Sequence, residues 1–160
     1  MLVKDIIAED FANYKVPSMF IVSSICDFKC CKEANVDVSM CQNSSLVKQK
    51  IKQIQDEDIF AIFSSNPITK AVVIGGLEPI MQTDEILHLI SVFRENNDNH
   101  DFVIYTGYYP NEIKDQITQL SYYDNIVVKF GRYIPNRPSC FDNVLGVTLA
   151  SNNQFALRIS

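Results

Sequence analysis

The stretch "AVVIGGLEPIMQTDEILHLISVF", residues 71–93, contains the unit on which the fold is built. Its first four residues are apolar and are followed by Gly75 and Gly76, which predicts a buried strand and then a sharp turn. Asp84 and Glu85 suit the first turn of a helix, because carboxylates are favourable at its positive end. The apolar residues that follow recur at helical spacing: Ile86, Leu89, Ile90 and Phe93. The stretch therefore predicts a strand, a turn and an amphipathic helix.

Three further segments have the composition of buried strands: "MFIVSS" (19–24), "DFVIYTG" (101–107) and "NIVVKFG" (125–131). The last two end in Gly107 and Gly131. Strands that are almost wholly apolar and alternate with amphipathic helices are typical of a parallel sheet. The sequence therefore predicts an α/β protein with a mostly parallel sheet. In such sheets the binding site lies at the carboxyl ends of the strands.

The segments between these strands carry the expected helices. An apolar stripe that starts at Val47 and ends at Ile54 predicts a helix after the first strand. The acidic residues 56–58 either kink this helix or start another one. Pro110 suits the first turn of a helix between the third and fourth strands. Residues 143–160 are expected to add two short strands.

The composition is that of a globular protein with an apolar core. The chain has 160 residues, of which 47% are hydrophobic and 21% charged, so we expect one domain spanning 1–160. The net charge of −5 argues against a nucleic-acid or anionic-membrane partner. Residues 1–15 carry acids where a signal peptide needs an apolar run, and no run approaches the ~18 residues of a membrane helix. A cytoplasmic location is expected.

Four of the five cysteines lie within sixteen residues: Cys26, Cys30, Cys31 and Cys41. In the cytoplasm, clustered cysteines bind metal or take part in redox chemistry more often than they form disulfides. A structural zinc site is one interpretation, but it lacks a second close pair, and His88 and His100 are distant in sequence. Buried apolar thiols are a second interpretation. The third is an iron–sulfur cluster held by three thiolates, with one iron open to a ligand.

The order of motifs resembles the radical S-adenosylmethionine (radical SAM) superfamily, in which three cysteines spaced C-x3-C-x2-C follow the first strand. More narrowly, the chain is similar to the activating proteins of anaerobic ribonucleotide reductase. The similarity extends over residues 19–159. Four motifs carry it, in this order: "CQN" (41–43), "GGLEP" (75–79), "YTGY" (105–108) and "ASNNQFALRI" (150–159).

The resemblance assigns cluster ligands. Cys26 and Cys30 match the first two positions of the motif. The third position would be residue 33, which is Glu33 in this chain. Cys41 matches the third cysteine through the Gln-Asn pair that follows it, and the spacing becomes C-x3-C-x10-C. Cys31 is an alternative to Cys30.

The resemblance also implies a fold and an activity. It implies a partial (βα) barrel of the radical SAM type that uses a 4Fe-4S cluster to cleave S-adenosylmethionine (SAM) reductively. It implies a large glycyl radical enzyme as partner, such as an anaerobic ribonucleoside-triphosphate reductase, and a flavodoxin or ferredoxin as electron donor. A radical SAM enzyme acting on a peptide or other substrate and a non-catalytic metal-binding module are alternatives. The residues expected to bind the cofactors are Asn43, close to the cluster, and Gly75, Gly76, Glu78, Thr106 and Gly107, near SAM.

Overall fold

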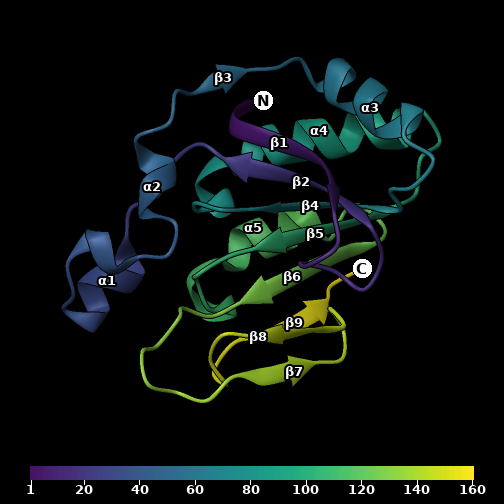
Figure 1. The fold of residues 1–160 in the computed structure, drawn as a ribbon. Helices are drawn as coiled ribbons and strands as arrows, with labels where there is room; N and C mark the ends of the chain where they lie inside the picture. The colour runs from purple at the N-terminus through teal and green to yellow at the C-terminus, as the bar shows by residue number, and fades with distance from the viewer.

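The computed structural model describes residues 1–160 and is organised around one seven-stranded sheet with the strand order β3-β1-β2-β4-β5-β6-β9 (Figure 1). The sheet is open and does not close into a barrel. A separate two-stranded sheet is formed by β7 and β8. The strands are β1 (Leu2–Asp10), β2 (Ser18–Ser23), β3 (Lys52–Gln53), β4 (Ala71–Gly75), β5 (Asp101–Tyr105), β6 (Ile126–Phe130), β7 (Cys140–Asp142), β8 (Val147–Leu149) and β9 (Phe155–Arg158).

The helices fall into two groups. In Figure 1, α3, α4 and α5 lie behind the sheet, whereas α1 and α2 lie beyond the ends of its strands. None of the helices is both long enough and apolar enough to cross a bilayer. The α-helices are α1 (Lys29–Ala34), α2 (Ser44–Val47), α3 (Asp56–Ser65), α4 (Thr83–Glu95) and α5 (Lys114–Leu120), and the short 3-10 helices are η1 (Val38–Met40), η2 (Pro79–Gln82) and η3 (Pro110–Glu112).

The centre of the sheet is parallel. Strands β2, β4, β5 and β6 pair side by side in the same direction, and these are the four strands that the sequence predicts. The predicted α/β class with a mostly parallel central sheet is thus confirmed. Since the four strands end at one edge, the segments that follow them lie together there. Antiparallel strands flank this parallel group, with β1 beside β2 and β9 beside β6.

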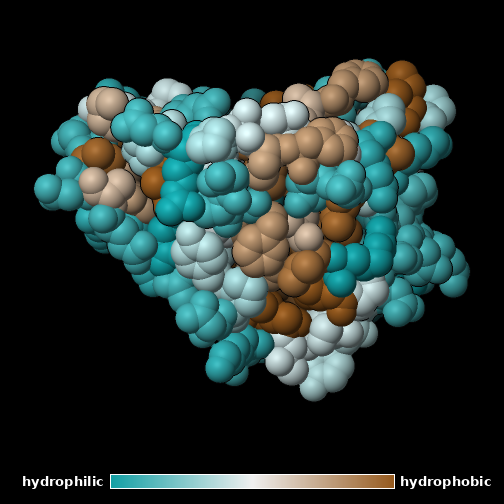
Figure 2. Space-filling view, turned by 90° about the horizontal axis from the view of Figure 1, so that it is seen from below, coloured by the Kyte–Doolittle hydropathy of each residue, from teal (hydrophilic) through white to brown (hydrophobic).

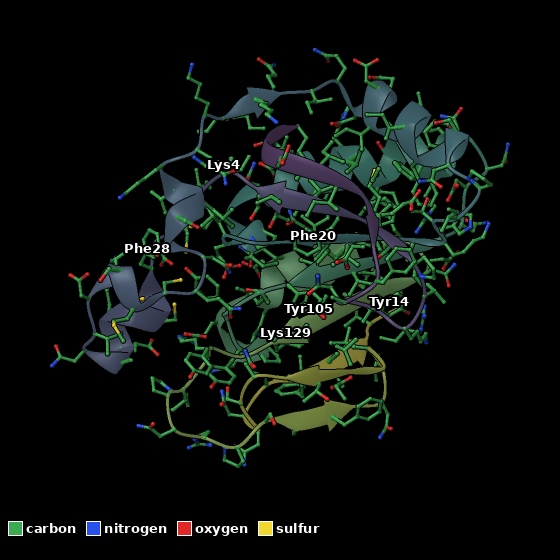
Figure 3. The ribbon with its side chains drawn as sticks, in the orientation of Figure 1. Lys4, Tyr14, Phe20, Phe28, Tyr105 and Lys129 are labelled. Atoms are coloured by element: carbon green, nitrogen blue, oxygen red, sulfur yellow. The ribbon has the colours of Figure 1, made fainter.

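Both faces of the sheet are covered, which explains why its central strands are apolar throughout. On the helical face, the ring of Phe93 in α4 packs against those of Phe60, Phe63 and Phe102 at centroid distances of 5.0–5.2 Å. On the other face, Tyr14 and residues of the 140–149 hairpin cover the buried valines of β4, β5 and β6. Figure 3 shows Tyr14, Phe20 and Tyr105 on this second face.

The surface at the end of the molecule that carries β7, β8 and β9 is partly apolar. Figure 2 views the molecule from below and shows apolar side chains in the middle of this face, surrounded by hydrophilic ones. Exposed apolar residues of these strands include Phe141 in β7 and Leu157 in β9. The outer edge of β9 is one of the two edges of the large sheet.

The predicted helix over Val47–Ile54 is wrong. The chain forms only the single turn of α2 there and then the short strand β3, which pairs with Leu2 and Val3 of β1. Lys4 of β1 explains the difference, because its Nζ donates to the carbonyl oxygens of Val47 (3.1 Å) and Gln49 (2.7 Å). These carbonyls are therefore bound to another strand. A separate helix, α3, starts at Asp56, in agreement with the second option that the acidic residues left open.

Replacing Lys4 by methionine is expected to destabilise the fold by about 1–3 kcal/mol, since two carbonyl oxygens lose their donor at a buried position. Urea unfolding followed by circular dichroism measures the change. Lys52→Met is a matched control, because the Lys52–Asp5 ion pair is exposed and pairs of this kind contribute about 0–1 kcal/mol. Equal losses in the two variants would contradict the structural role of Lys4.

Candidate metal centre

The cysteine segment, residues 26–41, follows β2 at the carboxyl edge of the sheet. Helix α1 carries Cys30 and Cys31, and it begins directly after Phe28, whose φ of 55° lies in the left-handed region. The backbone nitrogen of Phe28 donates to Sγ of Cys26 at 3.3 Å. Figure 3 shows Phe28 beside α1, with sulfur atoms drawn in yellow close to it. The chain therefore reverses its direction at Phe28, and the thiols of the cysteine segment lie in one region.

The four thiols differ in exposure. Cys31 is buried, whereas Cys26, Cys30 and Cys41 are partly exposed. The sulfur atoms of Cys30 and Cys31 are 4.0 Å apart, and Cys41 also contacts the Cys31 thiol. Burial, together with these neighbouring thiols, raises the pKa of Cys31 to about 11. Burial raises the pKa of Cys26 to about 12.

The fifth cysteine, Cys140, is separate from the others. It lies in β7, and its Sγ is 3.9 Å from the carbonyl oxygens of Ser151 and Gln154. No three cysteine, histidine, aspartate or glutamate side chains are arranged as a preformed metal site in this structure. The donor set nevertheless suits an iron–sulfur cluster, because three partly exposed thiols share one short segment and thiolates are the preferred ligands of such clusters.

A cavity of about 20 Å³ lies between this segment and the strand ends, and it has room for about one water molecule. The cysteine segment contributes Cys26 and Cys30 to its wall. The loops after β4 and β5 contribute Glu78 and Gly107, two residues that the resemblance implies as SAM-binding. The full lining consists of Cys26, Asp27, Lys29, Cys30, Glu78, Gly107, Tyr108 and Arg132. Sequence motifs far apart in the chain are thus brought to one place.

Glu78 connects two of these motifs. Its carboxylate is buried and accepts hydrogen bonds from the backbone nitrogens of Ile80 (3.2 Å) and Gly107 (2.9 Å) and from Oγ1 of Thr106 (2.7 Å). Burial raises the pKa of Glu78, an effect that these three hydrogen bonds oppose. A carboxylate has about four acceptor positions, so one remains for a further donor. Glu78, Thr106 and Gly107 therefore form one connected group.

Asn43, Gly75 and Gly76 do not line this cavity. Asn43 Nδ2 donates to the carbonyl oxygen of Gly76 at 2.5 Å, which attaches the residues after Cys41 to the end of β4. Gly76 has a φ of +84°, and an added Cβ would lie 2.7 Å from a methyl group of Val22. The small size of Gly76 is therefore needed to pack against β2. Gly107, in contrast, lies directly beside Glu78 at the cavity.

Two basic residues of this region were not predicted. Lys129 in β6 is buried, lies opposite Tyr105 of β5 in the sheet, and donates to the carbonyl oxygen of Gly131 at 2.8 Å. Burial lowers the pKa of Lys129 to about 8. Arg132, just after β6, lines the cavity and is also buried. The only available signal was the position of each residue at the end of a predicted strand.

The comparison with protein families decides between the interpretations of the cysteines. The family model described as "4Fe-4S single cluster domain" matches residues 17–148, which is most of the chain and includes all five of its cysteines. The chain belongs to this family. No curated protein and no solved structure matches it. Membership of the 4Fe-4S single cluster domain family supports the iron–sulfur interpretation over structural zinc or buried thiols.

Proposed function

We propose that this 4Fe-4S protein is a radical SAM enzyme. Cys26, Cys30 and Cys41 would hold the cluster, with Cys31 as the alternative to Cys30. SAM would bind beside it at the ends of β4 and β5. The observation that carries this proposal is the shared cavity, in which two thiols of the cysteine segment face Glu78 and Gly107. The open α/β sheet, with its cysteine segment directly after the first parallel strand, suits a partial barrel of the radical SAM type.

Each cofactor-binding residue has a distinct task in this proposal. When bound, the cluster supplies one electron that breaks a carbon–sulfur bond of SAM, giving methionine and a 5′-deoxyadenosyl radical. The free acceptor position of Glu78 would accept a hydrogen bond from the SAM amino group. Thr106 and Gly107 hold Glu78 in place, and Gly107, which lines the cavity, would lie beside the methionine or ribose. Asn43 keeps the residues after Cys41 close to Gly76.

The proposed partner is a large glycyl radical enzyme such as an anaerobic ribonucleotide reductase. This partner would supply a glycine whose Cα gives up a hydrogen atom, so that 5′-deoxyadenosine and a glycyl radical would be the products. A flavodoxin or ferredoxin provides the electron. Four parallel strands do not enclose a small substrate as a complete barrel does. The open edge therefore suits a loop of another protein.

Anaerobic reconstitution with iron and sulfide tests this function. The reduced, brown protein is expected to convert SAM into 5′-deoxyadenosine, measured by liquid chromatography, and the unreduced protein is expected to produce none. Addition of an anaerobic ribonucleotide reductase is expected to give a glycyl radical signal in electron paramagnetic resonance. A protein that holds a 4Fe-4S cluster but leaves SAM intact under reduction would contradict the proposal.

A further inference from the structure

Arg132 occupies an unusual position for a charged residue. It lies in the loop after β6, its side chain is only 6% exposed, and it lines the same cavity as Cys26 and Cys30. Its backbone is fixed from the other side, because Asn153 Nδ2 donates to the Arg132 carbonyl oxygen at 2.7 Å. A buried guanidinium needs carboxylate partners to offset the loss of water.

These partners come from two different segments. Nη1 and Nη2 of Arg132 bind the carboxylate of Glu112 in η3, and Nε lies 2.8 Å from Oε2 of Glu33 in α1. Lys29 of α1 also binds Glu112, with its Nζ 2.6 Å from Oε1. Arg132 additionally donates to the carbonyl oxygen of Gly107. Helix α1 is thus connected to the sheet edge twice, once through Glu33 and once through Lys29 and Glu112.

Aromatic side chains complete this network. The Tyr108 ring lies beneath Nζ of Lys29, 4.9 Å from its centroid, and the Tyr109 ring centroid lies 5.0 Å from the guanidinium of Arg132. The Tyr108 hydroxyl donates to Asp27 at 2.8 Å, and Asp27 directly follows Cys26. The two contacts of Tyr108 join the cysteine segment to the loop that follows β5, and the contact of Tyr109 joins that loop to Arg132 after β6.

Helix α1 has little else to hold it. It has six residues, of which only Cys31 is buried, and helices shorter than about 12 residues are marginal in water. Its place therefore depends on the polar contacts at its ends. An arginine fork that binds carboxylates bidentately fixes orientation as well as distance.

We propose that Arg132 is a positioning residue of the metal centre, which holds α1 and its cysteines against the ends of β5 and β6 by acting through Glu33 and Glu112. This inference rests on the proposed role of Cys26 and Cys30 as ligands, but it does not depend on SAM chemistry. Glu33 occupies the position at which the resemblance expects a third cysteine, and in this structure its carboxylate faces Arg132.

The test compares Arg132→Gln and Arg132→Lys with the control Arg158→Gln. Nη2 of Arg158 donates to both carboxylate oxygens of Asp101, and the Arg158 side chain is 40% exposed. In the full-length protein before cluster assembly, the rate at which iodoacetamide alkylates Cys26 and Cys30 is measured by mass spectrometry. Arg132→Gln is expected to raise this rate about tenfold and to lower the iron retained after reconstitution by about the same factor. Arg132→Lys should fall between Arg132→Gln and the wild type, because it keeps the charge but loses the fork.

Two further measurements separate positioning from general stability. Cys140 is an internal reference, and its alkylation rate is expected to stay unchanged in Arg132→Gln. Glu33→Gln is expected to raise the alkylation rate of Cys26 and Cys30 less when it is added to Arg132→Gln than when it is made in the wild type. The reason is that the two side chains act as a pair.

Equal acceleration at Cys140, or unchanged alkylation at Cys26 and Cys30, would overturn the proposal. Additive effects of the two substitutions would also overturn it. Neither readout requires SAM cleavage, so a failure of the proposed radical SAM activity would leave this result interpretable.

Discussion

Replacing Cys41 by alanine is expected to abolish retention of the 4Fe-4S cluster, whereas replacing Cys31 is expected to leave it in place. The physical reason is accessibility. Cys41 is partly exposed, as are Cys26 and Cys30, whereas Cys31 is the one buried thiol among the four.

Iron and acid-labile sulfide per chain, counted after anaerobic reconstitution, measure this difference. Cys26→Ala and Cys30→Ala are expected to behave like Cys41→Ala. Cys140→Ala is the matched control, because Cys140 lies in β7, away from the cysteine segment. Loss of iron in Cys31→Ala together with retention in Cys30→Ala would reassign the second ligand to Cys31.

The second large effect is expected at Glu78. Glu78→Ala leaves the hydroxyl of Thr106 and the backbone nitrogens of Gly107 and Ile80 without their acceptor in a buried place. Unsatisfied buried donors cost about 1–3 kcal/mol each, so we expect a total loss of about 3 kcal/mol or more in the free energy of unfolding. Urea unfolding measures this loss. Glu57→Ala, at an exposed position in α3, is the control and should change stability by about 0.5 kcal/mol or less.

The pH dependence of stability provides an independent test of Glu78. Burial raises the pKa of Glu78 above the ordinary value of 4.5, so the folded state binds a proton more tightly than the unfolded state does. The stability that comes from this group is therefore complete below pH 4.5 and is lost as the pH rises through the raised value. Glu78→Gln should lack this loss. The free energies of unfolding of the wild type and of Glu78→Gln are compared from pH 4.5 upward. Parallel curves would contradict the assignment of this loss to Glu78.

The parallel centre of the sheet could be predicted because its signals are local. Each of β2, β4, β5 and β6 is a short apolar run, and α4 shows its buried stripe directly in the sequence. Parallel pairing of these four strands is enough to place their carboxyl ends at one common edge of the sheet. The sequence therefore predicts that Glu78, Thr106 and Gly107 lie at one edge of the sheet.

Other features depend on contacts between distant segments. Strand β1 was not predicted, because its exposed face carries charges and its place is fixed by pairing with β2 and β3. Helix α2 ends at Val47 after one turn, because Lys4, more than forty residues earlier, binds the carbonyl oxygens of Val47 and Gln49. Arg132 was missed for the same reason, since Glu33 and Glu112 become its partners only in the folded chain.

The antiparallel strands β1 and β9 also determine how this fold can vary. A further strand–helix unit that extends the parallel group after β6 would have to displace β9, which now pairs with β6 along Val127–Phe130. On the other side, β1 occupies the free edge of β2 in the same way. A homologue with a longer parallel sheet must therefore lose one of these strands or place it elsewhere, whereas insertions in the loops at the carboxyl edge leave the sheet intact. Variation in this fold is accordingly expected to concentrate around the metal centre, where loop length can change without altering a strand pair.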